Sequence, residues 1–311
     1  MLDDEARSNL IAAIASDGEI RFDEAMARHT TLRIGGPADG YALPKTYEAL
    51  ARVRRVCRER GILSRAFGQG TNLLVRDGGI RGVAISLRHL ARVQKCEDQP
   101  EAGATDLWIE AGAATGKVLA FATINELGGV EFLGGVPGTV GGGLTMNAGT
   151  TLGEFKDVTL RVFSIDENGD TLIRENGECG FGYRRSTLPP SEVVTHARLR
   201  LTPRPRRDID QAVRQLRDRR KAREPHGVPN AGSIFKNPPG DYAGRLIEAC
   251  GLKGRRVGGA EVSPVHANWI VNAEKATAKD LLALGEIVKS EVVKRFGIEL
   301  EYEIKIVGEE R

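Results

Sequence analysis

Residues 128–149 read GGVEFLGGVPGTVGGGLTMNAG and hold nine glycines among 22 positions. Glycine loses more conformational freedom on folding than any other residue, so a cluster this dense is costly to order. Glycine also lets the backbone approach a flat or charged ligand closely, because it carries no Cβ. The cluster therefore favours a ligand-binding loop over a simple glycine-rich bend.

A second, shorter glycine cluster is GQGTN at residues 68–72, between an extended stretch and an apolar run. Successive small residues let backbone N–H groups converge on an anion such as a diphosphate, and Thr71 and Asn72 add side-chain donors. Leu73 rules out the Rossmann GxGxxG pattern, and GAATGK at residues 112–117 lacks the Walker spacing. From the residues alone, an ordinary turn stays an open alternative.

The composition is that of a globular protein with room for about two domains, since the chain has 311 residues, 41% hydrophobic and 28% charged. These values exclude disordered, coiled-coil and collagen-like classes. Glycine is in excess, at 38 residues. The net charge of +3 is too small to indicate nucleic-acid binding.

Neither a membrane segment nor a secretory leader is expected. Residues 132–153 run 22 positions without a charge, but eight of them are glycine, which predicts loop and strand. The start, MLDDEARSNL, is acidic and has no apolar core, so a cytoplasmic protein is predicted. Four widely spaced cysteines without a CxxC pattern predict reduced, buried thiols and no metal site.

Hydrophobic periodicity predicts alternating helices and strands, hence an α+β or α/β body. A hairpin-like turn is expected at residues 77–79 and a hairpin around Asn168-Gly169. The expected helices cover residues 50–57, 118–127, 208–222, 241–250 and 278–296. The expected strands include residues 80–87, 108–109 and 298–306.

A domain boundary is predicted near residue 205, where a Pro- and Arg-rich stretch separates an apolar strand from a charged helix. Residues 204–223 contain nine basic and three acidic residues and no aromatic residue. This pattern favours a solvated helix over a nucleic-acid surface.

Seven motifs occur in an order that resembles the UDP-N-acetylenolpyruvoylglucosamine reductases, over residues 28–308. They are LRIGGPAD (32–39), GQGTNLLVRDGGIRG (68–82), GGVPGTVGGGLTMNAG (134–149), FGYRRS (181–186), NAGSIFKNP (230–238), HANWIVN (266–272) and LEYEIKIVG (300–308). Ser233 follows Arg184 by only 49 positions, which resembles the short form of the family without an inserted substrate loop.

The resemblance implies an α+β protein with a two-lobed FAD-binding fold of the vanillyl-alcohol-oxidase (PCMH) type and a C-terminal α+β substrate domain. It implies an N-terminal segment (1–30) packing on the FAD region, an FAD-binding domain (31–204) and a substrate domain (205–311). The implied enzyme is a cytoplasmic monomer that uses NADPH and FAD. It would reduce UDP-N-acetylglucosamine enolpyruvate to UDP-N-acetylmuramate for peptidoglycan synthesis, with no metal, nucleic acid or membrane involved. Two alternatives stay open: another FAD-dependent oxidase of this fold, and a non-catalytic nucleotide-sugar binding protein.

Three catalytic residues follow from the resemblance. Arg184 of FGYRRS would meet the negative charge of the enolate, as a planar and permanently charged donor. Ser233 of NAGSIFKNP would donate a proton to the intermediate. Glu303, chosen over Glu301, would assist at the enol intermediate. Without the resemblance, these would be interpreted as a surface arginine, a cap and a solvated strand residue.

The resemblance also implies two sets of binding residues. The cofactor set is Gly68, Gln69, Gly70, Thr71, Asn72, Leu73, Gly135, Val136, Gly138, Thr139, Gly142, Asn147 and Gly149. The substrate set is Tyr183, Lys221, Arg223, Lys236, Asn237 and His266. A bulky residue at Gly70 or Gly142 is expected to reduce FAD binding, because its Cβ would enter the space of the cofactor.

Overall fold

The computed structural model describes residues 2–98, 100 and 103–311. Its contacts divide the chain into two compact units. Unit 1 holds the described residues of Met1–Phe22, Gly40–Gly68 and Gly82–Arg220, and unit 2 holds Asp23–Asp39, Gln69–Arg81 and Lys221–Arg311. Helices and strands occur together in both units, as the α+β prediction requires. The three-part domain division stays a prediction.

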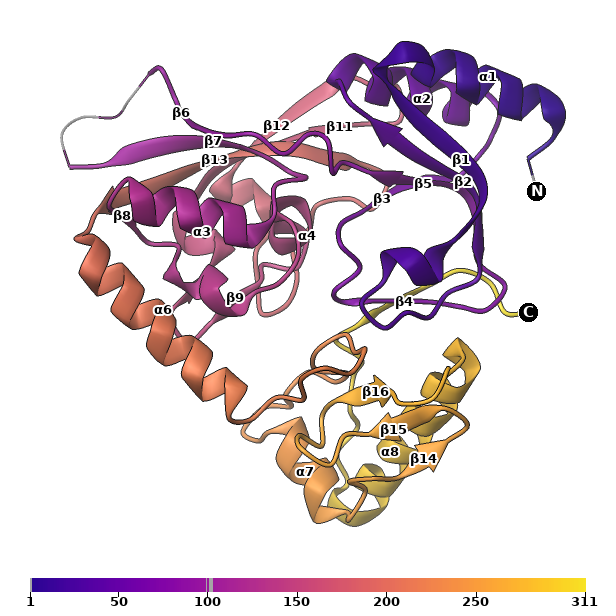
Figure 1. Cartoon of the computed structure of the whole chain (residues 1–311), viewed down its shortest axis with the longest axis vertical. Coiled ribbons are helices and arrows are strands. Elements are labelled where there is room, and N and C mark those ends of the chain that lie inside the picture. The colour runs from indigo at the N-terminus through magenta and orange to yellow at the C-terminus, as the bar shows by residue number, and fades with distance from the viewer. Residues whose placement is uncertain (1, 99, 101–102) are drawn as a thin grey trace. The chain divides into compact units, whose positions relative to one another are not determined.

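The first sheet has the strand order β1-β2-β5-β3, and two helices pack against it. The strands are β1 (Gly18–Ala25), β2 (Pro37–Pro44), β3 (Ser64–Phe67) and β5 (Ile80–Ser86). Helices α1 (Asp4–Ile14) and α2 (Tyr47–Glu59) lie side by side (Figure 1) and bury Leu10, Leu50 and Val53 against Val83 and Ile85. The Thr46 hydroxyl accepts a hydrogen bond from Ala49 N, which starts α2 at an N-cap.

The second sheet of unit 1 has the order β12-β11-β13-β7-β6, with β8 added to β13. Its strands are β6 (Val93–Lys95), β7 (Thr105–Glu110), β8 (Leu127–Gly128), β11 (Thr159–Ile165), β12 (Thr171–Glu175) and β13 (Val193–Pro203), and β9 (Gly149–Thr150) and β10 (Gly153–Glu154) form a separate pair. The helices are α3 (Thr115–Ile124), α4 (Val140–Thr145), α5 (Phe155–Val158) and α6 (Arg206–Lys221). The pairing of β11 with β12 confirms the hairpin predicted around Asn168-Gly169.

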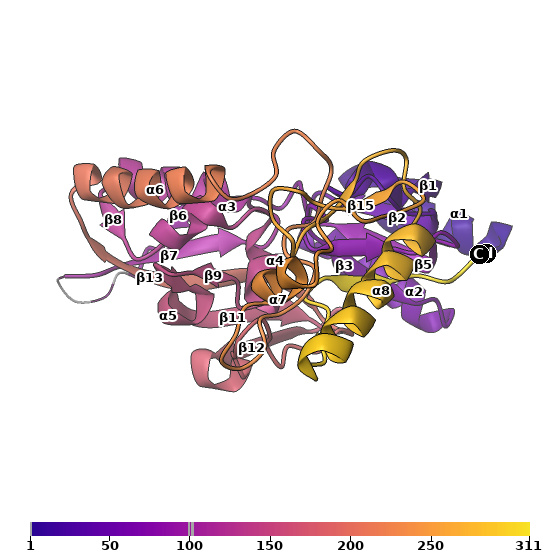
Figure 2. The ribbon, with the colours of Figure 1, turned by 90° about the horizontal axis from the view of Figure 1, so that it is seen from below.

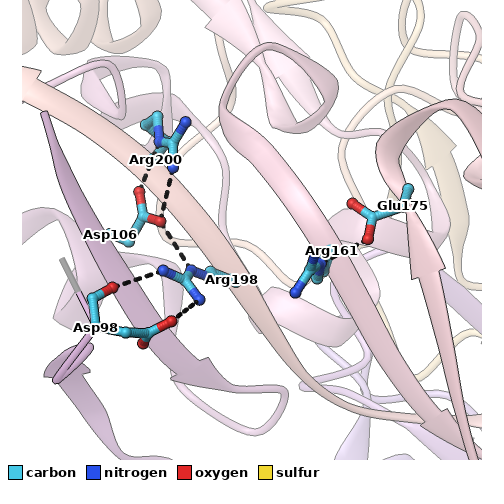
Figure 3. Close-up of polar contacts among 6 residues, drawn as sticks. All are labelled: Asp98, Asp106, Arg161, Glu175, Arg198 and Arg200. Carbon is cyan, nitrogen blue, oxygen red and sulfur yellow. Dashed lines mark hydrogen bonds and ion pairs between the residues drawn. The ribbon is translucent and has the colours of Figure 1, made fainter. Parts of the chain in front are cut away.

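Charged residues line one face of this second sheet (Figure 3). The buried Asp106 carboxylate accepts hydrogen bonds from Arg198 Nε at 2.8 Å and Arg200 Nε at 2.7 Å. Burial alone would raise the pKa of Asp106, but the hydrogen bonds from Arg200 and Arg198 outweigh it and lower the pKa. Side chains alternate between the two faces of a strand, so Leu199 points from β13 into the opposite, apolar core.

Unit 2 is built around a small sheet of β14 (Arg256–Val257), β15 (Ala260–Val262) and β16 (Ile270–Asn272). Helices α7 (Ala243–Ala249) and α8 (Ala278–Phe296) lie together in orange and yellow in Figure 2. They share one core that includes Leu246, Val262, Ile270 and Leu281. A parallel pair of β4 (Leu73–Val75) and β17 (Lys305–Val307) completes the unit. Short 3₁₀ turns elsewhere in the chain span Ala15–Asp17, Met26–His29, Glu131–Gly135 and Asn176–Cys179.

Several expectations for single elements were wrong. The strand predicted over residues 298–306 is reduced to β17, because Leu300 and Ile304 are buried in the unit 2 core rather than along a strand ladder. The turn at residues 77–79 is not a hairpin, since β4 pairs with β17 and β5 with β2 and β3. Helix α3 ends at Ile124, and Leu127 lies in β8.

All four cysteines are free thiols, but only Cys57 and Cys179 are buried. Burial raises the pKa of both thiols to about 11, so they are protonated at neutral pH. Among residues 2–98, 100 and 103–311, no helix combines the length and the apolar character needed to cross a membrane.

Candidate functional site

In unit 1, Gly68, the first residue of the first glycine cluster, packs against Thr139 of the second cluster. A Cβ added at Gly68 would lie 2.6 Å from Thr139 Oγ1, so this close approach requires glycine. Thr139 is the N-cap of α4, and its Oγ1 accepts a hydrogen bond from Gly142 N at 3.5 Å. Predicted cofactor-binding positions from the two clusters are therefore neighbours.

Packing within the protein accounts for several glycines of the second cluster. A Cβ added to any of six of them would lie within 3.0 Å of another atom of the chain: Gly128, Gly134, Gly135, Gly141, Gly143 and Gly149. At Gly143, for example, it would lie 2.1 Å from the Phe155 ring. Gly142 differs, because it is exposed and its Cβ would have only Thr139 Oγ1 near it, at 3.6 Å. At Gly142, therefore, the protein leaves room for a larger side chain.

The other predicted cofactor positions have mixed surroundings. Thr115 fastens two of them, since its Oγ1 donates to Val136 O at 2.6 Å and its N to Gly138 O at 3.0 Å. Gly70 lies in unit 2 with φ of +65°, and a Cβ there would lie 2.2 Å from His29 O. The reason given for keeping Gly70 small was therefore wrong: the protein itself fills that space. In the same stretch Gln69 is exposed, Thr71 is half-buried and Leu73 begins β4.

Helix α6 brings its basic side chains to the second glycine cluster. Arg217 Nε donates to Gly134 O at 3.4 Å, and Arg220 donates to Gly135 O. Its apolar residues Ile209 and Val213 join the core of the second sheet. The solvated helix predicted here therefore has one face that packs on the cluster. Lys221, at the end of α6, is exposed.

Arg184 lies in a tight turn that is closed by two hydrogen bonds, Gly182 N to Arg185 O at 3.0 Å and Arg185 N to Gly182 O at 3.2 Å. Its φ of +55° is in the left-handed region, where a non-glycine residue costs about 1–3 kcal/mol and persists only when its surroundings impose it. The Arg184 guanidinium lies 5.3 Å from the ring centre of Tyr183, which is exposed.

Two side chains fasten this turn to the second glycine cluster. Asn147 is fully buried, and its Nδ2 donates to Gly182 O at 3.1 Å. Its Oδ1 accepts from Lys156 N at 2.9 Å. Ser186 Oγ donates to Thr145 O at 2.9 Å. The cluster and the FGYRRS motif, far apart in sequence, thus form one structure within unit 1.

In unit 2, the backbone around Glu303 links two further motifs. Glu303 N donates to Ile234 O at 2.8 Å, next to Ser233, so the NAGSIFKNP and LEYE segments run side by side. Asn72 Nδ2 donates to Glu303 O at 3.2 Å, so a residue of the first glycine cluster also contacts the LEYE segment. Ser233 and Glu303 are both half-buried. Phe235 and Tyr302 stack with ring centres 5.0 Å apart and hold the same two segments together.

The predicted substrate residues Lys236 and Asn237 have partners within the protein. Lys236 Nζ lies 2.8 Å from Glu301 Oε2, and this hydrogen bond lowers the pKa of Glu301. Asn237 Oδ1 accepts from Ala243 N at 3.1 Å, at the start of α7. These contacts orient both side chains within the protein.

His266 is held beside α7. Asn268 N donates to its Nδ1 at 3.2 Å, and a Cβ at Gly244 would lie 2.9 Å from its Cε1. Burial lowers the pKa of His266, and the positive charges of Lys253 and Arg223 lower it further, against the opposing effect of Glu248.

Sequence reasoning missed Asn268. Its buried amide holds the NAGSIFKNP segment, since Nδ2 donates to Phe235 O at 2.8 Å and Oδ1 accepts from Phe235 N at 3.0 Å. The available indication was an asparagine inside the apolar stretch ANWIV, because a buried amide requires hydrogen-bond partners.

Comparison with known proteins identifies two matching family models. The FAD binding domain model matches residues 38–173, and the C-terminal domain model of UDP-N-acetylenolpyruvoylglucosamine reductase matches residues 224–307. The chain is 43% identical over 292 residues to such a reductase from Anaeromyxobacter dehalogenans, covering 94% of this chain and 87% of the relative. It is 40% identical over 305 residues to one from Geotalea uraniireducens, covering 98% and 99%.

The solved structures agree. The crystal structure of UDP-N-acetylenolpyruvylglucosamine reductase from Thermus caldophilus matches with a TM-score of 0.78 and 36% identity, covering 93% of this chain and 98% of that one. A berberine bridge enzyme variant matches with a TM-score of 0.50 and 18% identity, over 65% of this chain and 44% of its own. The latter similarity shows the flavin-binding fold alone. These matches confirm the fold class and the resemblance inferred from the seven motifs.

Proposed function

The chain belongs to the UDP-N-acetylenolpyruvoylglucosamine reductase family, and on that premise we propose that it reduces UDP-N-acetylglucosamine enolpyruvate to UDP-N-acetylmuramate. It is an FAD-dependent oxidoreductase, and NADPH is its hydride donor. The product is a precursor of bacterial peptidoglycan, made in the cytoplasm. The enzyme acts as a monomer on this small molecule.

The residues of unit 1 fit FAD. Gly68 and Thr139 bring the two glycine clusters together, and Gly142 offers exposed backbone with open space beside it. When bound, FAD would supply the chemistry of hydride transfer between NADPH and the methylene carbon of the enolpyruvyl group. The chain must hold these loops, bind the substrate carboxylate and supply a proton.

Arg184 carries the proposal. Hydride addition to the methylene carbon moves negative charge into the neighbouring carboxylate as an enolate, which a planar, permanently charged guanidinium stabilises. The supporting observation is that an arginine occupies a left-handed turn position that favours glycine. Backbone strain of this kind concentrates at functional sites, where a specific side chain is needed.

Ser233 and Glu303 complete the proposed set. Ser233 donates a proton to the basic carbon next to the carboxylate, a step that a hydroxyl can serve when its geometry is held. Glu303 assists on the adjacent segment, and the pairing of Glu303 with Ile234 supports their joint action. Lys221, Arg223, Lys236, Asn237, His266 and Tyr183 are assigned to substrate binding.

Anaerobic mixing tests the proposal. The purified protein should be yellow with about one FAD per chain, NADPH should bleach it, and the enolpyruvyl substrate should restore the colour. A colourless protein would support a binding module. A flavoprotein that only O₂ reoxidises would support an oxidase of the same fold.

A matched pair of variants tests the FAD assignment. Gly142→Leu should reduce FAD occupancy, whereas Gly116→Leu should not. Both glycines are exposed in the first turn of a short helix, and an added Cβ meets nothing closer than 3.6 Å at Gly142 and nothing within 4 Å at Gly116. Equal FAD content in the two variants would contradict the assignment of the second cluster to FAD.

A further inference from the structure

We propose that Asn147 is a positioning residue for Arg184 rather than a cofactor contact. The inference rests on the proposed function, because it assigns Arg184 to the enolate. It states that the Asn147 amide fixes where the Arg184 turn lies and so decides how well the guanidinium meets the substrate carboxylate.

Both ends of the Asn147 amide are engaged with backbone. Nδ2 donates to Gly182 O at 3.1 Å and Oδ1 accepts from Lys156 N at 2.9 Å, while the residue is fully buried. Asn147 itself has φ of +41°, a conformation that asparagine tolerates better than most other residues. The amide is therefore oriented toward the protein.

The two ends join a strained turn to a rigid part of unit 1. Gly182 opens the turn in which Arg184 has φ of +55°. Lys156 belongs to α5, and two other residues of this helix, Phe155 and Val158, are buried in the core of the second sheet. A strained conformation persists only when its surroundings impose it, and the hydrogen bond from Asn147 supplies such a restraint.

Ser186 provides a second, more accessible restraint on the other side of the turn. Its Oγ donates to Thr145 O at 2.9 Å, two residues before Asn147. Both hydrogen bonds run between the second glycine cluster and the FGYRRS motif. A shift of about 1 Å in a catalytic group can cost about 10²-fold in rate, so these hydrogen bonds matter for turnover.

Asn147→Asp is the most specific test. The two side chains have the same shape, and the carboxylate still accepts from Lys156 N, but it cannot donate to Gly182 O. Reduction by NADPH and FAD content should stay near the parental values. Reoxidation by the enolpyruvyl substrate should slow by roughly 10- to 10²-fold.

The pH profile of Asn147→Asp gives a readout that loss of stability would not produce. A protonated aspartic acid regains an O–H donor toward Gly182 O, so the deficit relative to the parent should shrink as the pH falls through the pKa of Asp at this position. Asn176→Asp is the matched control. Asn176 Nδ2 donates to Lys156 O at 2.8 Å and Thr159 O at 2.7 Å, so it holds the same segment without contacting the turn. Its substitution should leave reoxidation within about twofold of the parent.

A double-mutant cycle with Arg184→Lys decides the inference. If Asn147 acts through Arg184, the combined rate loss should be clearly smaller than the product of the single losses. If the parent is active and the rate loss of the double variant equals the product of the two single losses, the inference is overturned and the proposed function is not. A parent that the enolpyruvyl substrate does not reoxidise would overturn the proposed function and the inference with it. If Asn147→Asp does not fold, Ser186→Ala carries the same cycle, with a smaller loss expected and the same criterion.

Discussion

The Arg184 turn in unit 1 and the paired segments that carry Ser233 and Glu303 in unit 2 are held in different ways. The turn has a strained backbone, and side chains of Asn147 and Ser186 fasten it. The two segments are joined by main-chain hydrogen bonds such as Glu303 N to Ile234 O, and the side chains of Asn268 and Asn72 donate further hydrogen bonds to their backbones. Substituting the side chain of Ser233 or Glu303 should therefore leave these hydrogen bonds intact in unit 2. In unit 1, the position of the Arg184 turn depends on the side chains of Asn147 and Ser186.

Ser233→Ala should have the largest effect. The substitution removes the proposed proton donor from a backbone that main-chain hydrogen bonds hold, so the fold and the reduction by NADPH should be unchanged. Reoxidation by the enolpyruvyl substrate should slow by roughly 10²- to 10⁴-fold, the range for a lost general acid. Stopped-flow absorbance of the flavin resolves the two steps. Parental reoxidation in Ser233→Ala would show that the proton comes from another group.

Arg184→Lys should reduce reoxidation by roughly 10- to 10²-fold, because lysine keeps the charge but loses the planar fork that binds a carboxylate. Arg185→Lys is the control, since Arg185 is exposed in the same turn. FAD content, measured by absorbance, should match the parent in both variants. The reverse order of effects would move the assignment to Arg185 and remove the argument from backbone strain.

Glu303→Gln should slow reoxidation by about tenfold and Glu301→Gln should leave it unchanged, because only Glu303 is assigned a role near the intermediate. Glu301 is exposed and paired with Lys236, so its pKa is lowered and its charge is already matched. Steady-state kcat and KM for both variants check this. Equal losses would mean that the two carboxylates act as one charged surface.

Local patterns predicted much of the fold. Helices α2, α6 and α8 were predicted near their observed bounds, because regular apolar spacing marks all three. The strand over residues 298–306 was predicted wrongly, since alternation reports burial of Leu300 and Ile304 and not their strand partners. The density of glycines likewise located the second cluster. It did not show why each position is glycine, which at Gly143 is the close approach of the Phe155 ring.

The candidate site depended on contacts between residues far apart in the chain. Asn147 and Gly182 are 35 positions apart, and Asn72 and Glu303 are 231 apart. No periodicity or spacing encodes such pairs. The motif resemblance supplied the residue identities, while the structure supplied the hydrogen bonds that hold them.

The two units also differ in how they bury histidine. His266 in unit 2 is hydrogen-bonded to Asn268 N and lies near the cations Lys253 and Arg223. His196 in unit 1 stacks on the rings of both Trp108 and Phe163, with centres 3.7 Å and 4.1 Å away. Its Nε2 is buried without a hydrogen-bond partner among the described residues. Burial lowers the pKa of His196 to about 4.

The smallest predicted effect is an acid destabilisation that comes from His196. Its folded pKa of about 4 is below the ordinary value of 6.5, so the folded state resists protonation. The corresponding stability is fully present above pH 6.5 and is lost as the pH falls toward 4, which amounts to about 1 kcal/mol by pH 5.5. His196→Phe keeps an aromatic ring in the stack but cannot titrate. Urea unfolding at pH 7.5 and 5.5 should therefore show a smaller loss of unfolding free energy in this variant than in the parent. The control is His89→Gln, at an exposed histidine of unit 1, which should lose as much unfolding free energy as the parent does. An unchanged loss in His196→Phe would mean that the acid sensitivity comes from another histidine such as His266, whose pKa burial also lowers.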